Sequence, residues 1–126
     1  MKRLAISINS YRDLHVWQAA MALAERVFVL SKAFPDAELF GLTSQMRRAS
    51  VSVAANIAEG HGRETSGYYI QALRVAQGSL KELETHVLLA RRFQYATEED
   101  VGPVLETCDE VGRMLRALIR AIQDKK

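Results

Sequence analysis

Polar side chains recur at regular intervals within a mostly apolar stretch of the sequence, RRASVSVAANIAEGHGR at residues 47–63. A helix places residues three or four apart on one face. Amide, hydroxyl and carboxylate groups on such a face satisfy buried polar atoms, and guanidinium groups also bind phosphate. The stretch therefore predicts a helix with a polar stripe, formed by Gln45, Arg48, Ser52, Asn56, Glu59 and Arg63.

The polar stripe has two interpretations. In the one we favour it is structural: Ser52 and Asn56 satisfy buried backbone groups, and Glu59 pairs with Arg63 one turn later or with an arginine of a neighbouring helix. In the other, some of the arginines contact phosphate directly.

Catalytic and metal-binding patterns are missing from the sequence. No ExxH pair occurs, so a di-metal carboxylate site within a helical bundle is not expected. Glu82 and Glu84 are two residues apart and point to different helix faces, unlike a paired acid and base. GxSxG, Walker A and GxGxxG motifs do not occur either. We therefore expect no enzyme activity, catalytic residue, metal, cofactor or small-molecule substrate, and we expect Cys108 to be a buried, inert thiol.

The elements that position these residues follow from length and composition. The 126 residues fit a single domain over 1–126, and 48% hydrophobic with 25% charged residues is the composition of a soluble globular protein. No apolar run approaches the roughly 20 residues that span a bilayer. The start, MKRLAISINSYRD, has too short an apolar run for a secretory signal. We expect a cytoplasmic protein without a membrane partner.

Four helices are predicted, over residues 13–34, 42–59, 66–95 and 98–123, because apolar residues alternate at steps of four and three within each range. Asp13 is the expected N-cap of the first helix, and Thr97 with Asp100 forms a capping box for the fourth. Short loops join the four segments and no segment has the period of a strand. The fold class is therefore all-α, an antiparallel up-down-up-down four-helix bundle. The fourth helix is expected to bury Val104, Cys108, Val111, Leu115, Leu118 and Ile122.

A second apolar seam on the helix over 42–59 suggests contact with another subunit. It consists of Val51, Ala54, Ala55 and Ala58, whose small side chains let helices approach closely. Gly78 interrupts the third helix at a cost of about 1 kcal/mol relative to alanine, which close packing against another backbone would explain. We therefore expect a homo-oligomer.

The charges suggest a nucleic-acid partner. The net charge is only +2, but 12 arginines supply most of the 17 basic residues. In the expected bundle one pole is basic, and on the fourth helix Arg113, Arg116 and Arg120 follow one face. Our candidate phosphate contacts are these three arginines and Arg63, with Arg47 and Arg48 marking an alternative surface at the other pole. The predicted basic pole combines Lys2, Arg3, Arg12, Arg63, Arg116, Arg120, Lys125 and Lys126 with Asp13, Glu59, Glu64 and Asp124.

Two segments, FGLTSQMRRASVSVAANIAEGHGR and ALRVAQGSLKELETHVLLA, resemble the four-helix-bundle proteins encoded within intervening sequences of bacterial 23S ribosomal RNA genes. This family is similar to the accessory variability determinant of diversity-generating retroelements. The resemblance covers roughly residues 10 to 122 and implies a four-helix bundle without established enzyme activity. Through the retroelement protein it also implies a homopentameric barrel with a basic, nucleic-acid-binding surface. The sequence departs from the family pattern at Val53, where isoleucine is usual, and at His61, where an aromatic residue often stands.

The sequence thus leads to one hypothesis and two alternatives. The hypothesis is a non-enzymatic homo-oligomer that binds structured RNA or DNA as an accessory or scaffolding factor. The alternatives are a purely structural oligomer, whose basic pole only complements helix dipoles, and an enzyme with an unrecognised site.

Overall fold

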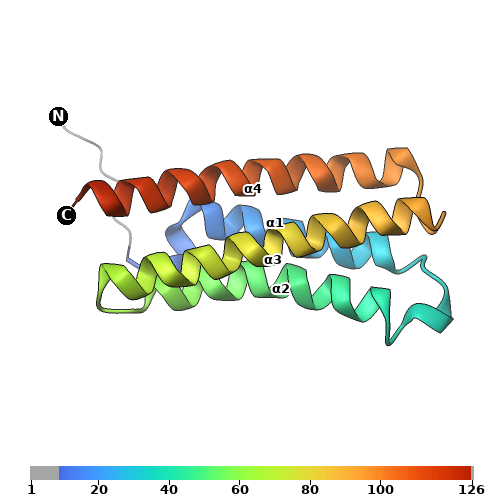
Figure 1. The fold of residues 1–126 in the computed structure, drawn as a ribbon, viewed down its shortest axis with the longest axis horizontal. Coiled ribbons are helices and arrows are strands. Elements are labelled where there is room, and N and C mark those ends of the chain that lie inside the picture. The colour runs from blue at the N-terminus through green and yellow to red at the C-terminus, as the bar shows by residue number, and fades with distance from the viewer. Residues whose placement is uncertain (1–8, 126) are drawn as a thin grey trace.

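The computed structural model describes residues 9–125 and contains four α-helices and two 3-10 turns, with no strand among those residues (Figure 1). The predicted all-α fold class is thus confirmed. In chain order the elements are η1 (Tyr11–Asp13), α1 (His15–Ser31), η2 (Asp36–Glu38), α2 (Leu42–His61), α3 (Ser66–Arg92) and α4 (Glu98–Asp124).

Consecutive helices run in opposite directions, which gives the up-down-up-down arrangement (Figure 1). Each helix packs on its sequence neighbours, and α4 returns to pack on α1, so the four helices enclose one core. The closest pairing is between α2 and α3. Gly60 allows it, because a Cβ at this position would lie 2.9 Å from the Cβ of Ala72 and 3.2 Å from the carbonyl oxygen of Tyr69.

The first helix differs from the prediction at both ends. Asp13 is not its N-cap: the Asp13 carboxylate accepts hydrogen bonds from the amides of Asn9 (2.8 Å) and Ser10 (3.3 Å), while Ser10 caps η1. The long helix starts after this turn, at His15, and ends at Ser31 rather than Phe34. Pro35 explains the early end, because a proline disfavours helical conformation in the residue before it.

The third helix ends at Arg92 rather than at residue 95, because Gln94 has a φ of 65° and reverses the chain. The predicted capping box of the fourth helix is present. Thr97 Oγ1 accepts from the Asp100 amide at 3.1 Å, and Asp100 accepts from the Thr97 amide at 3.0 Å. The hydrogen bond from the Thr97 amide to the Asp100 carboxylate, followed by the Thr97 side chain, lowers the pKa of the Asp100 carboxyl.

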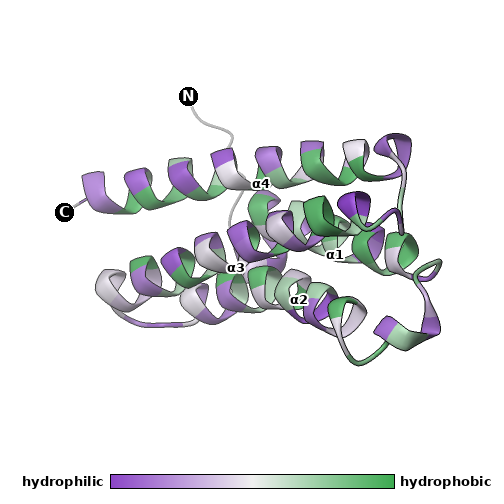
Figure 2. Cartoon of the chain, turned by 45° about the vertical axis from the view of Figure 1, so that its right-hand side comes forward, coloured by the Kyte–Doolittle hydropathy of each residue, from purple (hydrophilic) through white to green (hydrophobic). Residues whose placement is uncertain are grey.

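The core follows the predicted seams, with Leu23, Met46, Leu83 and similar side chains fully buried. In Figure 2 the hydrophobic residues of α4 face the other helices and its hydrophilic residues face away. The prediction slips by one position near the end of α4: Ile119 is buried, whereas Leu118 and Ile122 are half-buried. A strict 4,3 alternation has a period of 3.5 residues, so it drifts off the face of a helix with 3.6 residues per turn.

Candidate nucleic-acid interface

From Ser52 to Arg63 the polar stripe lies along the outer groove between α2 and α3. The hydroxyls of Ser52 and Ser79 are 2.8 Å apart and join the two helices. The amide nitrogen of Asn56 donates to the carbonyl oxygen of Ser52 at 2.8 Å and to its hydroxyl at 3.0 Å. Ser52 and Asn56 are half-buried, and their hydrogen bonds are made within the protein, to α2 and α3.

The C-terminal end of the polar stripe is an ion pair. Arg63 donates to Glu59 at 3.0 Å, as predicted, and its guanidinium lies 5.7 Å from the centre of the Tyr68 ring. Because Arg63 is exposed and already paired, its charge is partly neutralised before any ligand binds. Gln45, at the N-terminal end of the polar stripe, is exposed.

The two neighbouring arginines of α2 have different surroundings. Arg47 donates through Nε to the Ser31 hydroxyl at 2.8 Å and lies 4.7 Å from the centre of the Phe28 ring, so it holds α2 against α1. Arg48 is exposed and borders an open hollow with Phe28 and Val51. The structure therefore separates this pair into a packing residue, Arg47, and an exposed residue, Arg48, for which residues 9–125 provide no acidic partner within 4 Å.

The three arginines of α4 are exposed on the side of the helix that faces α3. Arg113 and Arg116 border a shallow hollow of about 190 Å³, to which α3 contributes Lys81 and Glu84. Lys81 is 3.3 Å from Glu84, and Arg113 and Arg116 have no acidic partner within 4 Å among residues 9–125. The same holds for Arg120, one turn beyond Arg116.

Sequence reasoning missed Arg74. It is exposed on α3 seven residues before Lys81, and two turns of helix place the two residues on the same face. Because α3 and α4 are antiparallel, Arg74 extends this basic surface in the direction of Arg116 and Arg120. The seven-residue spacing of Arg74 and Lys81 is visible in the sequence, but only the pairing of α3 with α4 places these residues beside the arginines of α4. We call this surface the basic strip: Arg74, Lys81, Arg113, Arg116 and Arg120.

The predicted basic pole is less distinctive. Lys2, Arg3 and Lys126 lie outside the described residues. Among residues 9–125 the pole has five basic and four acidic side chains, so their charges nearly cancel. Two of these basic side chains, Arg116 and Arg120, also belong to the basic strip, which runs along the side of the bundle. The basic side chains at the pole are Arg12, Arg63, Arg116, Arg120 and Lys125, and the acidic side chains are Asp13, Glu59, Glu64 and Asp124.

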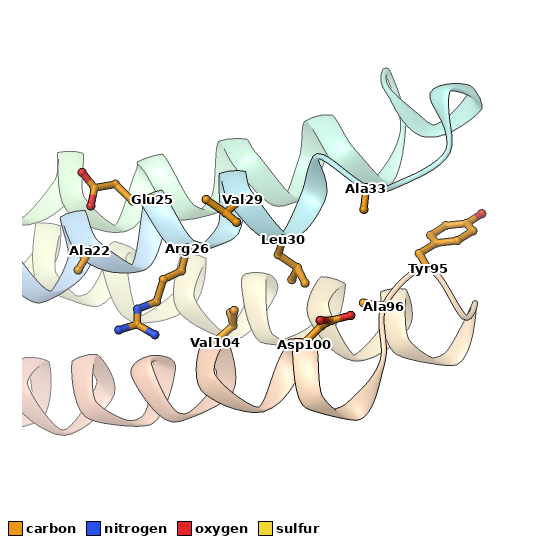
Figure 3. Close-up of a pocket in the computed structure, with 10 residues that line it drawn as sticks. All are labelled: Ala22, Glu25, Arg26, Val29, Leu30, Ala33, Tyr95, Ala96, Asp100 and Val104. Atoms are coloured by element: carbon orange, nitrogen blue, oxygen red, sulfur yellow. The ribbon is translucent and has the colours of Figure 1, made fainter.

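A groove between α1 and α4 has a different character. It has a volume of about 530 Å³ and mostly apolar walls. Leu30 of α1 and Val104 of α4 point toward each other across it, and Arg26 reaches toward α4 (Figure 3). Glu25 and Arg26 are the only acidic or basic residues of α1 apart from His15, so the outer faces of this helix are unusually apolar.

The buried titratable groups do not form a reactive site. Cys108 is fully buried, as predicted, and burial raises the pKa of its thiol to about 12. His86 is also buried, with Nε2 3.9 Å from Glu82. Across residues 9–125 no three His, Cys, Asp or Glu side chains converge as metal ligands. None of the helices in this range is both long and apolar enough to cross a membrane.

Comparisons with known proteins identify the family. A crystal structure of a protein of unknown function from the S23 ribosomal protein family of Bacteroides thetaiotaomicron matches with a TM-score of 0.77 and 24% sequence identity. The match covers 83% of this chain and 95% of the other. No curated protein is significantly similar. The family model described as 23S rRNA-intervening sequence protein matches residues 12–117. The chain therefore belongs to the family of 23S rRNA-intervening sequence proteins.

Proposed function

We propose that this protein is a non-enzymatic homo-oligomer that binds the phosphate backbone of RNA or DNA through the basic strip, as an accessory or scaffolding factor. One observation carries the proposal: exposed basic side chains of two helices, Lys81 of α3 with Arg113 and Arg116 of α4, border one hollow. Glu84 and Asp109 line the same hollow, but within the described chain only Lys81 of the three basic side chains has an acidic partner within 4 Å. Arginine donors fit phosphate oxygens in a fork, which suits backbone contacts.

Structured RNA is the first nucleic acid to test. The family description refers to 23S rRNA, and the Bacteroides relative is assigned to a ribosomal protein family. A rigid helical groove presents its charges at fixed spacing, as recognition of a regular phosphate backbone requires.

Self-association is the second part of the proposal, and the surface of α1 and α2 supports it. Phe28 and Val51 are 40% and 49% exposed beside one hollow, and Val29 on the other side of α1 is 68% exposed. Exposed apolar surface of this kind is typical of interfaces. The similarity to the retroelement accessory protein predicts a pentamer, whose mass sedimentation can measure.

Nucleic-acid binding is tested by its dependence on salt. Affinity for an RNA duplex should fall as salt rises, with a log-log slope of about 0.7 to 0.9 per phosphate neutralised. Arg116→Gln combined with Arg120→Gln removes two charges per subunit without touching the core, so affinity and slope should fall together for unrelated sequences.

The matched control is Arg48→Gln combined with Arg92→Gln, which removes the same charge at exposed positions outside the strip. It should bind like the wild type. If the control loses affinity and the strip variant does not, the contact surface lies at the other end of the bundle. A wild-type protein that binds neither duplex nor structured RNA at about 50 mM salt would leave the purely structural oligomer as the correct interpretation.

A further inference from the structure

A small hollow lies beside the polar stripe, in the groove between α2 and α3. Its volume is about 250 Å³, below the roughly 300–1,000 Å³ of sites for drug-sized ligands. One wall is aromatic and cationic, one edge carries side-chain amides, and the floor is apolar. The side chains that line it are Asn56, Glu59, Arg63, Tyr68, Gln71, Ala72 and Val75, and the carboxylate of Glu59 is paired with Arg63 at 3.0 Å.

The aromatic wall is a stacking platform. Tyr68 is 60% exposed, whereas the next residue, Tyr69, is half-buried. The guanidinium of Arg63 lies 5.7 Å from the centre of the Tyr68 ring, and Glu59 holds that guanidinium in place at 3.0 Å. Flat aromatic rings and guanidinium planes are the groups on which proteins stack unpaired bases.

The amide edge offers hydrogen bonds to a flat ligand. The nitrogen of Asn56 must face the Ser52 carbonyl oxygen, because that oxygen only accepts, so the Asn56 side-chain oxygen remains an acceptor without a partner among the described residues. Gln71 is exposed and adds a second amide. Amides provide both donors and acceptors, which match the edge of a nucleobase.

We propose that this hollow binds one unpaired nucleobase, stacked on Tyr68 with its edge toward Asn56 and Gln71. The inference rests on the proposed function, because the basic strip would hold the backbone of the same strand. The two surfaces share α3: Gln71 lines the hollow, and Arg74 of the strip is three residues further along the same helix. A strand crossing the outer face of α3 thus reaches both.

The test compares oligoadenylate RNA with an abasic oligomer that has the same number of phosphates. Wild-type protein should bind oligoadenylate more tightly. Tyr68→Leu should weaken that binding by about 5- to 150-fold, the equivalent of one lost base–aromatic stack, and should leave the abasic oligomer unaffected. Tyr68→Phe keeps the ring and should retain wild-type affinity. A 2-aminopurine in the oligomer should lose fluorescence on binding to the wild type but not to Tyr68→Leu.

A control outside the hollow is Tyr11→Leu, since Tyr11 also lies beside an arginine, Arg12 at 5.4 Å. Tyr11 is half-buried and its ring packs against Trp17 at 5.3 Å, so circular dichroism should first establish that this variant is folded. It should bind both probes like the wild type. Equal affinity of the wild type for both probes, with no effect of Tyr68→Leu, would overturn the inference and leave the proposed function standing. Absence of binding to either probe would overturn the inference, and the proposed function would then be decided by the duplex and structured-RNA measurements alone. If Tyr68→Leu changes the oligomer mass but not binding of oligoadenylate, the hollow is part of a subunit interface instead.

Discussion

The phenol of Tyr95 donates a hydrogen bond of 2.9 Å to the carboxylate of Glu38, so the loop between α3 and α4 is joined to the loop between α1 and α2. The second oxygen of that carboxylate accepts from the amide of Leu42, the first residue of α2, at 3.1 Å. Glu38 therefore supplies the cap that Gly41, at the N-cap position, has no side chain to provide. A Cβ on Gly41 would lie 2.8 Å from Glu38 Oε1, so the glycine makes room for this cap.

This arrangement predicts acid sensitivity. The Leu42 amide and the Tyr95 hydroxyl lower the pKa of Glu38, so its stabilising effect is complete above the pKa of the unfolded chain and is lost as pH falls through the lower folded value. Glu38→Gln should reduce the free energy of unfolding at neutral pH, and its difference from the wild type should shrink below about pH 4. Urea unfolding followed by circular dichroism at several pH values measures this difference in the free energy of unfolding. Asp36→Asn, an exposed carboxylate in the same turn, is the control; a difference for Glu38→Gln that is constant with pH would contradict the assignment.

Two glycines should respond in opposite ways to the same substitution. Gly60→Ala places a methyl group 2.9 Å from the Ala72 Cβ, so it should lower the free energy of unfolding by about 1–3 kcal/mol. Gly78→Ala meets no atom within 4 Å and should raise the free energy of unfolding by about 0.4–1 kcal/mol. Thermal and urea unfolding of both variants compare them directly. Equal effects would mean that α2 and α3 are not in close contact at Gly60.

Asn56 tests the structural interpretation of the polar stripe. Asn56→Leu removes the hydrogen bonds to Ser52 at a half-buried position, so it should destabilise the fold by about 0.5–1.5 kcal/mol. Urea unfolding resolves an effect of that size. A change of less than about 0.5 kcal/mol, typical of surface substitutions, would show that the amide faces solvent or ligand instead.

Assembly is expected to depend on the exposed apolar surface of α1 and α2. Ala55 is exposed on α2 one turn beyond Val51 of that surface, and Gly78 lies on α3, where a Cβ would meet open space. Ala55→Glu should therefore lower the oligomer fraction while helicity survives, and Gly78→Leu should do so only if the interface extends onto α3. Light scattering together with circular dichroism would detect this, and a mass that is the same for the wild type and both variants would remove these positions from any interface.

Cys108 should react only when the fold opens. Its thiol is fully buried and its pKa is raised to about 12, first by loss of solvation and then by the charges of Glu84 and Asp109. Because the thiolate is the reactive form, labelling by a disulfide reagent at neutral pH should be slow and should accelerate with urea. Rapid labelling of the native protein would show that the seam between α3 and α4 opens locally.

The sequence by itself determined the features that depend on neighbouring residues. Apolar residues at steps of four and three predict the helices because each helical turn brings such residues to one face. Thr97 and Asp100 predict the start of α4 because a capping box needs only residues three apart. The pair of Glu59 and Arg63 is predictable for the same reason, since four residues make one turn.

Only the tertiary structure decided which faces meet. Arg47 and Arg48 are adjacent in sequence, yet the rotation of α2 turns Arg47 onto α1 and leaves Arg48 exposed. Arg74 joins the arginines of α4 because α3 and α4 are paired and antiparallel, which local spacing does not encode. The bond from Tyr95 to Glu38 spans 57 residues. Such contacts depend on the rotation and register with which whole helices pack, and these are set by the sum of many side-chain contacts across the core rather than by any single motif.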